Sequence, residues 1–367
     1  MWHNQDKVDY LKDFIKKNGI DALFISSAPR VFYLTGFSST NAYVIITSES
    51  KVFLTDPRYF ERASEELVGW DLVEIKNSVI KEVIDLLKSR EAKLVGYEKD
   101  RLTCEFLEAL QKEKEIEFVG FSGILDDLRK FKDQVELGII EEGIKITDEI
   151  YEAGVKYLKN SLSKGEILTE LELRGYLVFQ MLKKGASGES FPAIVACGKA
   201  SSIPHWETSN QKIAPQAPLL IDMGLRWKGY CTDFTRTLYL GKPTQEFLKA
   251  YELVKSAWFI GFERVREGEP LKKVDEAIRK YFKKHGVDKY FVHATGHGIG
   301  VEIHEAPRVS LKTPEEELIK EGMVFTIEPG LYFKDAFGIR LENVVLVRGG
   351  RGEVVSEVPL DLEVIEV

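Results

Sequence analysis

The first third of the chain alternates between helix-like and strand-like patterns of apolar residues. Apolar positions recur every three or four residues over 6–18, which predicts an amphipathic helix that ends at Gly19. Short apolar runs predict strands, and two longer periodic stretches predict helices. The predicted strands are 22–26, 31–35, 42–47, 51–55 and 93–97, and the predicted helices are 78–90 and 103–114. This alternation favours an α/β unit.

The same region carries little chemistry. It holds no cluster of histidines, cysteines or paired acids, and Asp56 and Arg58 fit a turn with a solvated ion pair. We therefore expect the N-terminal part to shape a site without carrying the reaction. A charged helical pattern then runs over 126–162 without a proline or a turn cluster, which predicts one long bridging helix. The expected domains are 1–125 and 126–367.

The second half repeats one order of elements. A predicted helix at 169–184 precedes a strand at 191–198 and a hairpin at 219–240. Another predicted helix, at 271–285, precedes a histidine-rich stretch and a hairpin at 323–347. The two copies share an architecture and not an evident sequence. Their order predicts a pseudo-symmetric domain with its site between the two halves.

The composition is that of a globular protein. Of 367 residues, 44% are hydrophobic and 30% charged, and the chain is long enough for two cores. The net charge of −8 argues against a nucleic-acid partner, which needs a basic face. No apolar run has the length of a signal peptide or a membrane helix, so we expect a cytoplasmic protein without a membrane partner. Three widely separated cysteines argue against a disulfide framework or a cysteine zinc site.

Candidate chemistry concentrates at residues 290–307, YFVHATGHGIGVEIHEAP. Three of the six histidines lie here, at His293, His297 and His304. Glycines flank His297 on both sides, and we expect them to leave room for a metal ion or another bulky group. A lone histidine is more often structural, but three so close together in a His-poor chain indicate a histidine site. The glycine spacing differs from G-x-G-x-x-G, which excludes a nucleotide-binding loop.

Each of the two predicted hairpins carries two acids. If the first has a two-residue loop at Trp227 and Lys228, and the second a turn centred on Asp335, the acids of each hairpin are directly opposed. The opposed pairs are Asp222 with Asp233 and Glu328 with Glu342. Protonation of one acid, or a nearby arginine such as Arg236 or Arg340, would relieve the repulsion. Two divalent cations explain both pairs and the histidine together, and such ligands suit Mn²⁺, Co²⁺, Fe²⁺ or Zn²⁺.

These residues and their surroundings resemble the M24 metallopeptidases, which have the pita-bread fold. The similarity includes GHGIG, EIHE, TIEPG and IRLEN, and residues 129–367 resemble the whole catalytic domain. The preceding part resembles the creatinase-type N-terminal domain of Xaa-Pro aminopeptidases and Xaa-Pro dipeptidases, which methionine aminopeptidases typically lack. The resemblance implies an α/β (α+β) protein, with a creatinase-type α/β domain followed by a pseudo-symmetric pita-bread catalytic domain.

The resemblance also implies a metal-ligand set. The implied ligands are Asp222, Asp233, His297, Glu328 and Glu342. Asp233 and Glu342 would bridge two divalent ions, for which we expect Mn²⁺ or Co²⁺, with Zn²⁺ or Fe²⁺ as alternatives. Glu328 would in addition act as the general base.

Substrate contacts are implied for four further residues, His205, His293, His304 and Arg340. His304 would donate to the oxyanion, while His205 and His293 would contact the substrate or help protonate the departing nitrogen. Trp206 departs from the family pattern, where a small or polar residue or a second histidine is common. This departure affects the expected side-chain preference beside His205.

The same resemblance includes proteins with functions other than that of an Xaa-Pro aminopeptidase. Metal-free creatinases and non-enzymatic binding modules with this fold have lost the acidic ligands, all of which this chain retains. An Xaa-Pro dipeptidase stays open, although TDPRYFERA at 55–63 favours the bacterial aminopeptidase type. The expected partner is a peptide with proline at position two, and a homodimer is expected.

Overall fold

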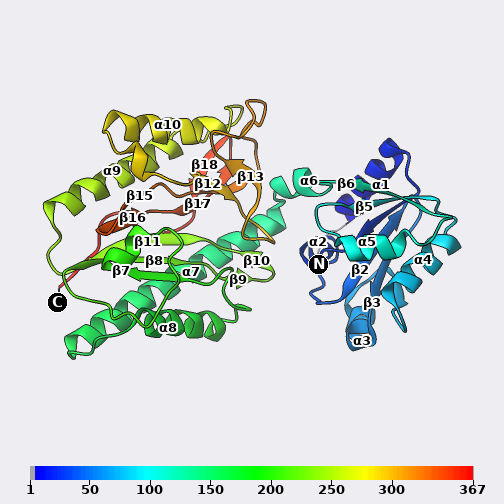
Figure 1. Cartoon of the computed structure of the whole chain (residues 1–367), viewed down its shortest axis with the longest axis horizontal. Coiled ribbons are helices and arrows are strands. Elements are labelled where there is room, and N and C mark those ends of the chain that lie inside the picture. The colour runs from blue at the N-terminus through cyan, green and yellow to red at the C-terminus, as the bar shows by residue number, and fades with distance from the viewer. Residues whose placement is uncertain (1–4, 367) are drawn as a thin grey trace. The chain divides into compact units, whose positions relative to one another are not determined.

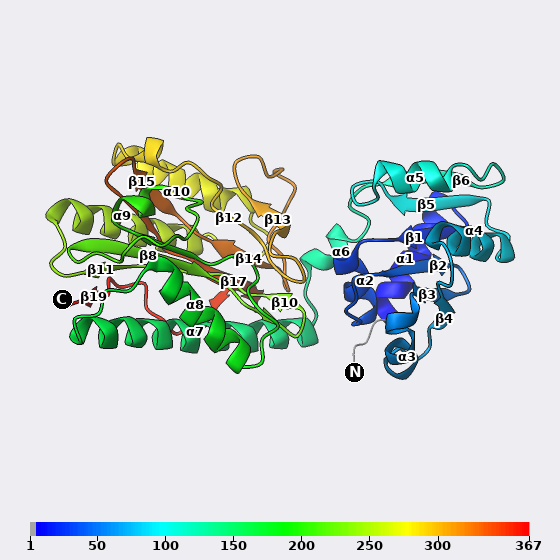
Figure 2. The same cartoon turned by 60° about the horizontal axis from the view of Figure 1, so that its bottom comes forward.

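The computed structural model describes residues 5–366 and forms two compact units, which divide between Leu128 and Arg129. Figures 1 and 2 show that each unit has its own β-structure. Each unit also has its own hydrophobic core residues. Within residues 5–366, no helix combines the length and apolar character needed to cross a membrane.

The N-terminal unit is built on a six-stranded mixed sheet (Figure 1). Its order is β4 (Asp71–Glu74), β3 (Lys51–Thr55), β2 (Ala42–Thr47), β1 (Ala22–Ile25), β5 (Leu94–Glu98) and β6 (Glu117–Phe121). Strand β1 pairs antiparallel with β2 and parallel with β5, and all four of its residues are buried. This burial is expected of an interior strand.

Helices connect these strands and complete the core. They are α1 (Gln5–Asn18), α2 (Ala28–Thr35), α3 (Pro57–Glu66), α4 (Val79–Ser89) and α5 (Cys104–Leu110). Val83 and Leu87 of α4 and Leu110 of α5 share a core with Phe24 of β1. The unit therefore folds around apolar residues that the alternating pattern had marked.

The predicted strand at 31–35 is wrong, because these residues end helix α2. A proline lies in the first turn of α2, where its missing N–H is not needed, and Gly36 ends the helix with a φ of 72°. The expected turn at Asp56 also begins a helix, since its side chain caps α3 by accepting from the backbone N–H of Arg58 (2.9 Å). Short apolar runs do not distinguish a strand from a buried helix, and these caps decide it.

The predicted bridging helix is two helices, α6 (Asp126–Lys130) and α7 (Gln134–Ser163). The break lies at Asp133, whose side chain accepts from the backbone N–H groups of Val135 and Glu136. Glu136 in turn accepts from the N–H of Asp133, which completes a capping box. This capping box begins α7 at a point where the charged pattern of the sequence continues without interruption.

Two similar halves make up the second unit, each a helix pair over a sheet (Figures 1 and 2). The first half packs α7 and α8 (Glu170–Lys183) on the sheet β19 (Val364–Ile365), β11 (Phe234–Leu240), β8 (Ala217–Met223) and β7 (Ile194–Cys197). The second packs α9 (Gln245–Phe262) and α10 (Lys272–Lys284) on the sheet β13 (Glu305–Val309), β12 (Gly296–Gly298), β14 (Val324–Ile327), β17 (Asn343–Arg348) and β18 (Arg351–Val354). The sequence pattern missed α9, which Thr244 caps.

Short ribbons extend each of the two hairpins. The first ribbon pairs β9 (Arg226–Trp227) with β10 (Tyr230–Cys231), and the second pairs β15 (Gly330–Phe333) with β16 (Phe337–Arg340). Two 3-10 turns, Gly198–Ser202 and Asp288–Tyr290, complete the unit. The acids of interest lie where each ribbon joins its main sheet.

Candidate metal centre

The register of the first hairpin differs from the prediction. Lys228 and Gly229 form its loop, and both have positive φ values, 47° and 87°. A two-residue turn with two positive φ values suits the twist of a hairpin, and glycine accepts it readily. Asp222 therefore lies opposite Thr235, and not opposite Asp233. The aspartates still share one face because they are offset by two residues.

The second hairpin has the predicted register. Ile327 pairs with Asn343 on one side of the acids and Gly330 pairs with Arg340 on the other, so Glu328 faces Glu342. A backbone bridge then joins the two hairpins. It pairs Thr235 with Glu342, which brings the acids of both halves together.

His297 adds an imidazole to this group of acids. Its Nδ1 lies 3.1 Å from the carbonyl oxygen of Gly298, and its Nε2 lies 3.4 Å from Asp233 and 3.7 Å from Glu328. A ring that donates from Nδ1 keeps the lone pair of Nε2 directed at the carboxylates, which is the tautomer a metal ligand needs.

Gly296 and Gly298, which flank His297, are in close contact with neighbouring main chain. A Cβ on Gly296 would lie 1.9 Å from the carbonyl oxygen of Thr326, and one on Gly298 would lie 2.2 Å from that of Ala306. The glycines thus allow the backbones of neighbouring segments to come close. The prediction of close approach was right, but the approaching group is main chain.

The donor set fits divalent cations. Ligand atoms of Asp233, His297 and Glu342 lie within 4.8 Å of one another. Among residues 5–366, Asp222 Oδ1 and Glu342 Oε1 are buried acid oxygens without a hydrogen-bond partner. Burial without a partner is costly for an anion, and a cation would remove that cost. The remaining Glu342 oxygen accepts from Thr235 Oγ1 (2.6 Å), which fixes the carboxylate.

Electrostatics support the same interpretation. Burial and the nearby charge of Asp222 raise the pKa of Asp233 well above its usual range. Burial and the charge of Asp233 raise the pKa of Glu342, and burial with the charge of Glu342 raises that of Glu328. The protein thus holds several carboxylates closer together than their own charges favour.

Arg340 contacts Asp222, and not Glu342, the acid two residues away. Its Nη2 donates to Asp222 Oδ2, and its Nη1 donates to the hydroxyl of Tyr332 (2.7 Å). The Tyr332 hydroxyl lies 2.8 Å from Nε2 of His293, whose Nδ1 lies 2.8 Å from the carbonyl oxygen of Ala294. Sequence reasoning missed Tyr332, because an aromatic residue in an apolar strand gives no signal of such a network.

The three predicted substrate-facing histidines have different surroundings. Burial and the charge of Arg340 lower the pKa of His293 to about 3, so that its imidazole is neutral. The ring of His304 lies 4.3 Å from that of His297, nearly perpendicular to it. Burial and the charge of His297 lower the pKa of His304. His205 is exposed, and the carbonyl oxygen of the preceding residue, Pro204, accepts from Arg340 (3.3 Å), which places this segment beside Arg340.

Trp206 fixes the segment that carries His205. Its indole N–H donates to Glu170 (2.8 Å), a fully buried carboxylate that also accepts from the backbone N–H groups of Cys197 (2.9 Å) and Ser209 (3.2 Å). The residue that departs from the expected pattern is thus an anchor. Its side chain packs against a small apolar cluster.

Sequence comparison relates the chain to known peptidases. Residues 139–349 match the profile of Metallopeptidase family M24, and residues 7–131 match the Creatinase/Prolidase N-terminal domain. An Xaa-Pro dipeptidase of Pyrococcus horikoshii is 32% identical over 93% of this chain and 94% of its own length. Both halves of the chain therefore have relatives in one group of proteins.

Solved structures give the same result. An Xaa-Pro dipeptidase from Bacillus anthracis has a TM-score of 0.93 at 31% identity and covers 99% of this chain and 100% of its own. An X-Pro aminopeptidase from Thermotoga maritima has a TM-score of 0.87 at 27% identity, with 95% and 98% covered. The expected fold, a creatinase-type domain followed by a pita-bread catalytic domain, is confirmed.

Proposed function

The chain belongs to metallopeptidase family M24, and from that premise we propose that it is a two-metal exopeptidase that cleaves the bond before a proline at position two of peptides. The observation that carries this proposal is the cluster of buried acids beside His297, in which Asp222 and Glu342 each keep a carboxylate oxygen without a donor. Such a cluster suits cations that neutralise it and activate water.

Five residues would hold the ions. Asp233 and Glu342 would be shared by both ions, Asp222 would complete the first, and His297 with Glu328 the second. Mn²⁺ or Co²⁺ suits this oxygen-rich set with one imidazole, and Zn²⁺ or Fe²⁺ is also compatible with it. When bound, paired divalent ions acidify a water molecule and polarise the substrate carbonyl.

Proton transfer would fall to Glu328. Its carboxylate lies 3.7 Å from His297 and 3.9 Å from His293, between a ligand and a substrate-facing residue. From there it would accept a proton from the attacking water and return it to the departing nitrogen. His304, beside His297, would donate a hydrogen bond to the developing oxyanion.

Substrate orientation would depend on Arg340, Tyr332 and His293. The hydrogen bonds from Arg340 to Tyr332 and between Tyr332 and His293 hold the imidazole in one orientation. His293 and His205 would contact the substrate around the scissile bond. A prolyl nitrogen has no N–H to donate, so recognition must come from such side chains.

An Xaa-Pro dipeptidase is the second candidate, since relatives with both activities in their names cover nearly the whole chain. Assays of purified protein on Xaa-Pro and on Xaa-Pro-Yaa peptides separate the two. We expect cleavage of the longer peptides, with little or none when alanine replaces proline. Hydrolysis of dipeptides alone would establish the dipeptidase, and a preference for N-terminal methionine over proline-containing peptides would contradict both.

We also propose a homodimer, which rests only on the resemblance to this family. Sedimentation of the purified protein tests it, with an expected mass of twice 41.8 kDa. A monomer mass at assay concentration would contradict it.

A further inference from the structure

Glu305, directly after His304, is a buried carboxylate that the proposed mechanism does not use. Its side chain is only 5% exposed, and it is the first residue of β13, at the end of the loop formed by residues 299–305. Lys132 Nζ lies 2.8 Å from one of its oxygens, and Arg129 pairs with the other. Both cations belong to the segment that opens the second unit, far away in sequence.

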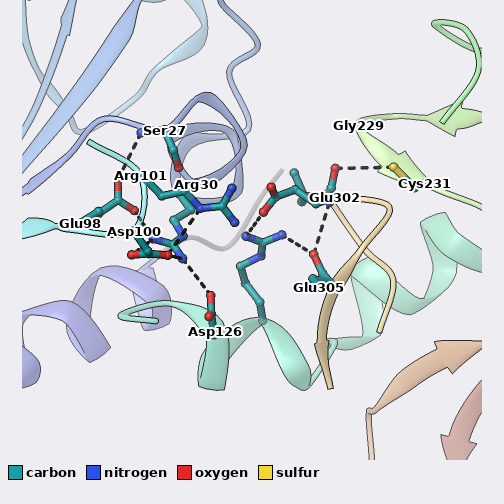
Figure 3. Close-up of polar contacts among 12 residues, drawn as sticks. Ser27, Arg30, Glu98, Asp100, Arg101, Asp126, Gly229, Cys231, Glu302 and Glu305 are labelled. Carbon is teal, nitrogen blue, oxygen red and sulfur yellow. Dashed lines mark hydrogen bonds and ion pairs between the residues drawn. The ribbon is translucent and has the colours of Figure 1, made fainter. Parts of the chain in front are cut away.

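Arg129 joins two acids of the same loop. One arm of its guanidinium pairs with Glu305, and the other donates to Glu302 (2.7 Å). The backbone N–H of Glu302 donates to Glu305 as well (3.3 Å). Figure 3 shows Glu302 and Glu305 side by side on the loop. Such a fork fixes two positions of a loop at once.

The segment that supplies these cations is itself anchored. The backbone N–H of Lys132 donates to the carbonyl oxygen of Gly322 (2.8 Å), and Phe131 forms a β-bridge with Met323, next to β14. Strand β14 leads directly to Glu328. The segment 129–132 that holds Glu305 is therefore connected to the proposed metal centre through β14. The two cations that hold Glu305 are thus anchored to the sheet that contains β14.

The other side of the loop is held by main-chain contacts. The N–H of Cys231 donates to the carbonyl oxygen of Gly300 (2.7 Å), and Arg226 donates to that of Val301 (2.8 Å). A Cβ on Gly300 would lie 2.2 Å from a carboxylate oxygen of Glu305. The third glycine of GHGIG therefore makes room for this carboxylate.

We propose that Glu305 is a positioning residue for His304, and that its ion pairs with Arg129 and Lys132 hold the loop so that the His304 imidazole stays against His297. This inference rests on the proposed function, in which His304 contacts the oxyanion. Oxyanion donors act only when they are held at the right place before the reaction, and a misplacement of about 1 Å can cost up to about a hundredfold in rate. The ion pairs of Arg129 and Lys132 with Glu305 supply that constraint.

The test compares Glu305→Gln with Glu189→Gln. Glu189 is a matched control, since it binds Arg174 through both oxygens (3.0 and 2.8 Å) and accepts from the backbone N–H of Ala193, and neither partner belongs to this loop. We expect E305Q to lower kcat about ten- to thirtyfold with KM and metal content nearly unchanged, because the donor acts in the transition state. E189Q should change kcat less than about twofold.

A second comparison asks whether Glu305 acts through His304. In the His304→Ala background, E305Q should change kcat less than about twofold, since the group it positions is gone. An equal loss in both backgrounds, or loss of metal from E305Q, would overturn the inference. If E305Q fails to fold, Arg129→Lys keeps the charge but lacks the fork, and the same cycle applies to it.

Hydrogen exchange separates this inference from the proposed function. In metal-loaded E305Q, amides of residues 299–309 should exchange at least about tenfold faster than in wild type, while E189Q leaves them unchanged. If wild type cleaves no Xaa-Pro peptide, the proposed function fails and this exchange result still decides the positioning. Unchanged exchange in E305Q would show that the ion pairs do not hold the loop.

Discussion

Two regions of the molecule gather several carboxylates around a buried group, and they differ in what surrounds those charges. In the N-terminal unit, Glu98, Asp100 and Asp126 converge on the buried guanidinium of Arg30, at 2.8, 2.9 and 3.0 Å (Figure 3). The second oxygen of Glu98 accepts from the backbone N–H groups of Ser26 and Ser27. Both oxygens of the innermost acid thus have partners within the chain.

In the proposed metal centre, the acids outnumber the cationic side chains that pair with them. Among the described residues, Arg340 is the only arginine or lysine that forms an ion pair with these acids, and it pairs with Asp222 alone. Burial and mutual repulsion raise the pKa of Asp233 and Glu342. Among residues 5–366, no acid oxygen of the Arg30 cluster is buried without a hydrogen-bond partner. Buried acids that the chain itself neutralises are structural, and buried acids that it leaves unneutralised indicate a site for cations from solution.

Removal of metal should have the largest effect and should act on one region only. Chelation should abolish peptidase activity, and Mn²⁺ or Co²⁺ should restore it. The metal-free protein should also unfold at a lower temperature, because binding to the folded state stabilises it. Activity assays with elemental analysis measure this. Full turnover of protein shown to be free of metal would contradict the proposed centre.

Variants of Glu328 and His304 should separate a ligand from a substrate contact. His304→Ala should keep its metal while kcat/KM falls by about two to three powers of ten, the scale of one lost oxyanion donor. Glu328→Gln removes the base and weakens a ligand, so its activity should fall further. Single-turnover rates and metal content are the measurements. Metal loss in H304A together with a metal-replete, active E328Q would reverse the two assignments.

The sequence predicted some parts of this centre correctly and others wrongly, and the local backbone geometry explains the difference. The proposed metal ligands and histidines come from motifs, and the register of the second hairpin followed from its turn. The first register failed because the position of a two-residue loop depends on which residues adopt positive φ, and Lys228 with Gly229 does so. The assignment of 31–35 failed because a buried helix and a strand share short apolar runs.

Long-range polar contacts lay beyond the sequence pattern. Nothing near Glu305 or Tyr332 marks their partners, since Arg129 lies 176 residues from Glu305 and the Tyr332 hydroxyl meets His293 across 39 residues. Such pairings are decided by the packing of whole elements. For the same reason, the sequence marked the unneutralised acids but could not show that Arg340 pairs with Asp222.

Arg30 provides the matching test in the N-terminal unit. Arg30→Met leaves Glu98 buried without its cation, and such a loss costs about 3–5 kcal/mol. Arg58→Met is the control, because Arg58 also pairs with an aspartate but its side chain is 70% exposed, where such a pair contributes little to stability. Urea unfolding followed by the methyl signals of Leu23 and Val95 measures the loss. Equal losses in both variants would remove the distinction between the buried cluster and a surface pair.

The smallest expected effect is a pH dependence of the Arg30 cluster. Burial raises the pKa of Asp100, but its hydrogen bond to Arg30 and the charge of Arg30 outweigh this and lower the pKa below its ordinary value. A carboxyl whose pKa is lower in the folded state stabilises that state above its unfolded pKa, near pH 4, and loses this contribution as the pH falls. Asp100→Asn should therefore reduce the acid-side slope of stability, measured with the same methyl signals in urea.

Asp71→Asn is the matched control for this pH dependence, because Asp71 pairs with Arg90 at 3.1 Å on the exposed side of the same unit. It provides the reference slope against which D100N is compared, since an exposed pair contributes little to stability. Identical slopes for wild type and D100N would show that Arg30 does not favour the charged form of Asp100. The comparison between a cluster neutralised from within and one neutralised by metal would then rest on Glu98 alone.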